Sequence, residues 1–168
     1  MSQSTLKDVA IAHRIKGFTE DICCIDTDME EKFLKNDITA LCVTARSFPE
    51  GITDAFTTIH SLLPSKERML VGISKPNPEG TIIYKAGFEL LAGEPAMEEL
   101  EAVVISSGKY LCQSIEGFAE NPQLIKNAFD VLLQDARLDP NGFCLELYVK
   151  PDEVWCMVPC RKKIKFWY

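Results

Sequence analysis

The sequence predicts an α+β fold in which two strand–helix–strand–strand modules form one antiparallel sheet with both helices on one face. Three observations lead to this fold class. Strand-like and helix-like segments follow one another in the same order in both halves of the 168-residue chain. The helix of the second half repeats the first at a displacement of 73 residues, with Pro122 matching Pro49. The composition, 46% apolar and 26% charged, is typical of a soluble globular protein.

The first module begins at Asp37. Residues 38–44 are β-prone, and Ser47-Phe48-Pro49 is typical of a helix start, where proline suits the first turn. Two more strands are predicted at residues 69–74 and 81–90, with a turn-rich segment between them. The helix before them is predicted from apolar residues at helical spacing, which are Ile52, Ala55, Phe56, Ile59 and Leu63.

The second module has the same plan. Residues 108–117 alternate like a strand, and Asn121-Pro122 predicts a helix N-terminus followed by an apolar stripe from Ile125 to Leu133. The last two strands are predicted at residues 143–149 and 154–158.

The displacement of 73 residues also aligns Val71 with Cys144 and Ile73 with Glu146 in the strands that follow the helices. Two such modules leave the sheet face opposite the helices for solvent or a ligand. We expect a cleft on that face, at the pseudo-twofold axis between the modules.

The repeat divides the chain into three segments: an N-terminal extension at residues 1–36, a domain at 37–160 with modules of about 37–92 and 106–160, and a basic, aromatic tail at 161–168. In the extension, Asp26-Thr27-Asp28 predicts the cap of a short helix that reaches Phe33 or Leu34, and residues 22–25 predict a strand.

Composition excludes several classes of function. A formal net charge of -7 argues against binding to a phosphate backbone. Seven cysteines without a signal-peptide pattern favour reduced thiols in a cytoplasmic protein, and no apolar stretch is long enough to span a membrane. The cysteine spacing does not fit a structural metal site, and no Gly-rich phosphate loop is present, so we expect neither a metal nor a cofactor.

Glu146 is the most unusual residue of the chain because it lies within an otherwise apolar strand. Leaving a carboxylate unpaired in such a place costs several kcal/mol. By strand alternation, Glu146 shares a face with Cys144 and Tyr148, whereas Leu145 and Leu147 face the other way. That face is either a solvated sheet surface or the wall of a binding cleft.

Aromatic residues are the expected companions of Glu146. If the valines of the last strand face the helices, Trp155 and Met157 face the cleft, although a tryptophan that covers the sheet edge is the alternative. Tyr84 and Tyr110 come from the two modules and are expected to line the groove from either side, or else to be core tyrosines.

Several short tracts resemble the GyrI-like family, the effector-binding domain found after AraC-type and MerR-type DNA-binding domains. The resemblance spans residues 37–160 and lies in tracts with a shared order and spacing, which are Tyr84-Lys85-Ala86-Gly87, Ser107-Gly108-Lys109-Tyr110, Gly117, Leu145-Glu146-Leu147-Tyr148 and Val158-Pro159. It implies a tandem-module fold with a central cleft for small, often aromatic or cationic, molecules. It also implies that Glu146 faces the ligand.

The sequence therefore predicts a cytoplasmic small-molecule-binding protein whose ligand is an effector-like or drug-like compound, with a cationic aromatic one among the candidates. Residues 1–36 are too few for a helix-turn-helix module, so direct DNA binding is not expected. Two alternatives remain. One is a hydrolase of strained or electrophilic small molecules that uses Glu146 as its catalytic residue, as in some stand-alone members of the family. The other is a module that binds a protein partner.

Overall fold

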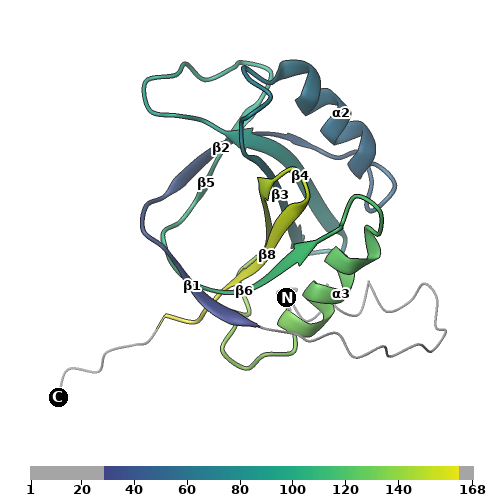
Figure 1. The fold of residues 1–168 in the computed structure, drawn as a ribbon, viewed down its shortest axis with the longest axis vertical. Coiled ribbons are helices and arrows are strands. Elements are labelled where there is room, and N and C mark those ends of the chain that lie inside the picture. Colours follow the sequence, from purple (N-terminus) through teal and green to yellow (C-terminus); the bar gives the residue numbers. More distant parts are fainter. Residues whose placement is uncertain (1–28, 163–168) are drawn as a thin grey trace.

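The computed structural model describes residues 29–162, which form one antiparallel sheet of eight strands and two helices (Figure 1). The spatial order of the strands is β1-β6-β8-β7-β3-β4-β2-β5. The first half comprises β1 (Glu30–Leu34), β2 (Ile38–Thr44), α2 (Ile52–Leu62), β3 (Leu70–Pro76) and β4 (Ile82–Glu89). The second half comprises β5 (Glu101–Ile105), β6 (Gly108–Glu116), α3 (Gln123–Leu132), β7 (Cys144–Lys150) and β8 (Glu153–Pro159).

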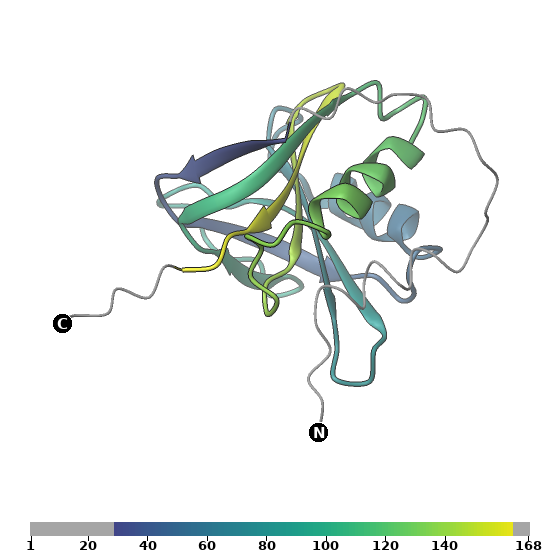
Figure 2. The same ribbon diagram turned by 90° about the horizontal axis from the view of Figure 1, so that it is seen from below.

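The two modules join at the centre of the sheet, where β3 pairs with β7. The short strand that precedes each module pairs with the other module, because β1 pairs with β6 and β5 pairs with β2. The Ser107 N–H donates to Asp37 Oδ1 at 2.6 Å, so the β1–β2 and β5–β6 connections meet. The sheet therefore curls strongly, and both helices lie on the outside of the curl (Figures 1 and 2).

Each helix covers its own half of the sheet. Helix α2 buries Ala55 and Ile59 against β2 and β4, and α3 buries Ala128, Phe129 and Leu132 against β6 and β8. These residues recur at the helical period that the sequence shows, and burying such an apolar stripe stabilises a short helix. The predicted fold class is confirmed. No helix among residues 29–162 is long and apolar enough to cross a bilayer.

Apolar side chains fill the inside of the curl. Six strands contribute to this inner cluster, whose buried members are Ala40, Cys42, Val71, Ile73, Ile105, Tyr110, Cys112, Leu145, Leu147 and Met157. The expectation that the face opposite the helices is left for solvent or a ligand is thus wrong for most of that face. The edge strands β1 and β5 curl toward each other and enclose it.

Two edge strands differ from the sequence prediction. Residues 30–34 form β1 and not the end of a short helix, and residues 101–105 form β5, which the sequence did not indicate. Both strands are short, and each is stabilised by hydrogen bonds to a strand of the other module. Long-range pairing of this kind overrides local propensity. The predicted strand at residues 22–25 lies outside the described residues.

Candidate functional site

Glu146 lies at the centre of the sheet, on the face that the helices cover. Its direct partners are Gly72 on β3 and Cys156 on β8, and residues directly opposite in antiparallel strands share a face. Val71 and Ile73 belong to the inner cluster on the other face. The alignment of Ile73 with Glu146 is therefore wrong by one residue, and Gly72 faces the carboxylate.

Gly72 provides the space for this carboxylate. A Cβ atom at position 72 would lie 2.7 Å from Glu146 Oε2 and would collide with the hydroxyl of Tyr84. Both neighbours are buried, since Glu146 is 7% exposed and Tyr84 is 2% exposed. Only glycine leaves room for a carboxylate and a phenol at this position of β3.

Two tyrosines hold one oxygen of the carboxylate. Tyr84 Oη and Tyr148 Oη donate to Glu146 Oε2 at 2.8 and 2.7 Å. The second oxygen, Oε1, accepts no hydrogen bond from the described residues, yet it is not among their fully enclosed unsatisfied atoms. We infer that Oε1 accounts for residual exposure of Glu146. No Lys or Arg among residues 29–162 forms a salt bridge with Glu146.

Burial dominates the electrostatics of the site. It raises the pKa of Glu146 above the ordinary 4.5, while the hydrogen bonds from Tyr148 and Tyr84 oppose the rise. Burial and the nearby Glu146 charge raise the pKa values of both tyrosines, so the phenols stay protonated as donors. The site is thus a carboxylate that is costly to ionise and lacks a cationic partner among the described residues.

Aromatic rings from both modules surround the carboxylate. Phe48 stacks on Tyr84 with ring centroids 6.0 Å apart, and Phe118 meets Tyr148 edge-on at 5.3 Å. Phe56 of α2 contacts both tyrosines edge-on, at 6.3 Å from Tyr84 and 5.6 Å from Tyr148. We call these five residues the aromatic cluster. All but Tyr84 are only partly buried.

We expect Glu146→Gln to stabilise the protein at pH 8, because the amide oxygen can accept both tyrosine hydrogen bonds without a buried charge. Because the pKa of Glu146 is raised in the folded state, the wild-type carboxyl group adds to the free energy of unfolding below about pH 4.5. This contribution to stability is lost as the pH rises through the folded-state pKa. The advantage of the variant should reach about 1.4 kcal/mol for each pKa unit of the shift. Urea denaturation of both proteins from pH 4 to pH 8 measures it. A wild type that equals the variant at pH 8 would show that the charge carries no cost.

The structure brings together only half of the predicted ligand-facing residues. Glu146, Tyr148 and Tyr84 form one group, as described above. Met157 is buried in the inner cluster, and Trp155 packs against it on the same face, away from Glu146. Lys32 Nζ lies 4.1 Å from the centroid of the Trp155 ring, and Trp155 Nε1 donates to Glu153 Oε1 at 2.9 Å.

Tyr110 also lies on the inner face. Its hydroxyl donates to the backbone oxygen of Ser106 at 2.7 Å, and its ring meets Phe143 edge-on at 6.4 Å. The core alternative that the sequence left open for Tyr110 thus describes its position.

No group of three or more His, Cys, Asp or Glu residues suited to a metal ion occurs among residues 29–162.

Sequence reasoning missed four residues of the site. Phe56 was interpreted only as part of the apolar stripe of α2, and Phe48 only as part of a helix start. Phe118 and Gly72 carried no prediction. One signal was available, because Phe48 and Phe118 occupy matching positions, each between the first strand of a module and its helix. A glycine inside a predicted strand was a second signal of close approach by a buried group.

No protein-family model matches the chain, and no curated protein matches its sequence. Solved structures do match. SAV2435, solved with tetraphenylphosphonium bound, has a TM-score of 0.58 and 12% identity, over 80% of this chain and 94% of its own. An integron cassette protein from the mobile metagenome of Vibrio cholerae has a TM-score of 0.57 and 16% identity, over 79% and 95% of the two chains. At these identities, the likeness shows that the chain shares the fold of both proteins.

Proposed function

We propose that this protein is a small-molecule-binding protein of GyrI-like type that takes an amphipathic, aromatic cation at Glu146. The observation that carries the proposal is a buried carboxylate that has no basic partner among residues 29–162 and is surrounded by five aromatic rings. A buried charge is ordinarily paired with an opposite charge, because its desolvation costs more free energy than two neutral hydrogen bonds contribute. A ligand cation supplies the missing partner.

The aromatic cluster suits the same class of ligand. Ring faces attract cations with about 0.5–2 kcal/mol each, and flat apolar area contributes through burial. Phe56, Phe118 and Tyr148 are partly buried, so each retains surface that a ligand can cover. The shared fold with SAV2435, which was solved with tetraphenylphosphonium, supports a bulky organic cation as the first compound to test.

Access to Glu146 is expected between the helices. Helices α2 and α3 pack mainly on the sheet and make little contact with each other. Phe56 comes from α2, and Phe118 precedes α3, so the rings above the tyrosines belong to different modules. Phe56 contacts both tyrosines, so a rotation of its ring about χ1 and χ2 would widen the approach to the carboxylate without breaking the sheet. We propose this ring as the gate of the site.

Titration calorimetry with tetraphenylphosphonium at pH 8 tests the proposal. Glu146→Gln should weaken binding about tenfold or more, because a charge pair at about 4 Å in a partly buried site exceeds 1.4 kcal/mol. Neutral triphenylphosphine oxide should bind both proteins about equally weakly. Glu153→Gln is the matched control, since Glu153 lies beside Trp155 on the other face and should not affect affinity. Loss of binding in Glu153→Gln, with Glu146→Gln unchanged, would place the cation at Trp155 and contradict the proposal.

Acid–base chemistry is a second use of the same group. Burial raises the pKa of Glu146, which a general acid needs near neutral pH, and the two phenol donors fix the orientation of its carboxyl group. A hydrolase of this kind should turn over a strained-ring electrophile, and Glu146→Gln should abolish turnover while the compound still binds. Unchanged substrate after long incubation with excess protein would exclude this use for that class of compound.

A further inference from the structure

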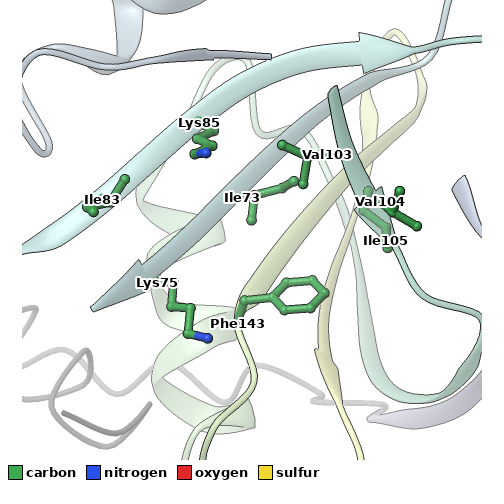
Figure 3. A pocket seen from close by; sticks show the side chains of 8 residues that line it. All are labelled: Ile73, Lys75, Ile83, Lys85, Val103, Val104, Ile105 and Phe143. Atoms are coloured by element: carbon green, nitrogen blue, oxygen red, sulfur yellow. The ribbon is translucent and has the colours of Figure 1, made fainter. Parts of the chain in front are cut away.

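A pocket opens on the sheet face opposite Glu146, where the inner cluster does not fill the curl. It has a volume of about 210 Å³ and lies between strands β3, β4 and β5 and the residue that precedes β7 (Figure 3). The edge strand β5 contributes Val103, Val104 and Ile105 to its lining. The aromatic cluster has no part in its lining.

The floor and walls of the pocket are apolar. Ile105 is fully buried and Ile73 is 9% exposed, and they form the floor. Val103 and Phe143 are half-buried and form the walls. The Phe143 ring is oriented by its edge-on contact with Tyr110. Water in such a pocket finds few hydrogen-bond partners, so a flat apolar group should displace it readily.

Two lysines give the pocket a positive rim. Lys75 and Lys85 both project at its border (Figure 3). Lys85 Nζ is engaged by Glu101 Oε2 at 2.5 Å. Lys75 is exposed, and it forms no ion pair with any residue of the described range 29–162. The Lys75 ammonium is therefore available to an anion whose apolar part enters the pocket.

We propose that this pocket binds a small amphipathic anion, with its carboxylate or sulfonate at Lys75 and its apolar body on Ile73, Val103 and Phe143. The volume limits the size of that body. Sites for drug-sized ligands span about 300–1,000 Å³, so this smaller pocket fits a body of about two fused rings or a short branched chain. The ligand class is thus opposite in charge to the one proposed for Glu146.

The two sites are separate although they share one strand. Gly72 and Ile73 are neighbours on β3 and point to opposite faces, the first toward Glu146 and the second into the pocket. The sheet itself lies between the two ligands. Binding of the anion therefore does not depend on the proposed cation function, and either can fail without the other.

Calorimetry with 2-naphthoate as the probe tests the inference. The wild type should bind the naphthoate, and Lys75→Gln and Lys75→Glu should weaken binding about fivefold and about tenfold or more. Val103→Phe should abolish naphthoate binding altogether, because the larger ring fills the pocket while Lys75 stays in place. Lys66→Gln, at an exposed position outside the pocket, is the matched control and should bind as the wild type does. Thermal melting of each variant checks that it is folded.

Three results would overturn the inference. The first is no binding of 2-naphthoate by the wild type, and the second is wild-type affinity for the naphthoate in both Lys75→Glu and Val103→Phe. The third is loss of naphthoate binding in Glu146→Gln with no loss in Lys75→Glu, which would place the anion on the helix face. The cation 2-naphthylmethylammonium, with a similar ring body, should bind the pocket more weakly than the naphthoate does.

Discussion

Gly72→Ala should destabilise the protein by about 1–3 kcal/mol and should abolish cation binding at Glu146. In an ordinary strand this substitution is neutral or favourable, because alanine loses less backbone entropy than glycine on folding. Here the new methyl group would collide with the Tyr84 hydroxyl and lie 2.7 Å from Glu146 Oε2. Both groups are buried, so neither can move away without breaking the hydrogen bond between them. Urea denaturation measures the loss.

A double-mutant cycle shows whether the loss arises at this site. Tyr84→Phe removes the colliding hydroxyl, so Gly72→Ala should cost about 1 kcal/mol less in that background. Gly87→Ala is the matched control on the neighbouring strand. Its methyl group would meet Leu41 O and Cys42 Sγ, so it should destabilise the protein without rescue by Tyr84→Phe. A Gly72→Ala protein as stable as the wild type would show that the carboxylate and the phenol are not packed against β3.

Phe56→Ala should have the other large effect, a loss of about 2–3 kcal/mol in stability together with weaker cation binding. Phe56 contacts both tyrosines that hold Glu146, and it packs on the core beneath α2. Truncating a fully buried phenylalanine costs about 3–5 kcal/mol, and Phe56 is only partly buried. Thermal denaturation and calorimetry with tetraphenylphosphonium measure the two losses.

Phe33→Ala is the matched control for Phe56→Ala. Phe33 lies on the edge strand β1 and is 68% exposed, so its truncation should change stability by no more than about 0.5 kcal/mol. Phe56→Leu should restore most of the stability but little of the affinity, because leucine fills space without a ring face. Equal affinity in Phe56→Leu and the wild type would remove Phe56 from the site.

The regular elements were predictable because their patterns are local. Strand β2 and the apolar stripes of α2 and α3 follow from alternation and helical spacing within a dozen residues. Strands β1 and β5 were not predictable in the same way. Each has five residues and is stabilised by pairing with the opposite module, which no local window contains.

Prediction from the sequence was less accurate for the candidate site than for the regular elements. A displacement of 73 residues describes the helices well, but the pairing of β3 with β7 places Gly72 opposite Glu146. An error of one residue in a strand moves a side chain to the other face of the sheet. Alternation did give the right face for Val154 and Trp155 relative to each other. What failed was the expectation of a Glu146 cleft on the face opposite the helices, because Glu146 lies on the face that the helices cover.

The pH dependence of tetraphenylphosphonium affinity tests the charge role of Glu146 most directly. The cation should bind the ionised carboxylate, so wild-type affinity should be constant well above the raised pKa of Glu146 and should fall below it. The fall should approach tenfold per pH unit, since one proton competes with one cation. Glu146→Gln should bind weakly and equally at every pH between 4 and 8. Parallel curves for the two proteins would contradict a binding site built on this carboxylate.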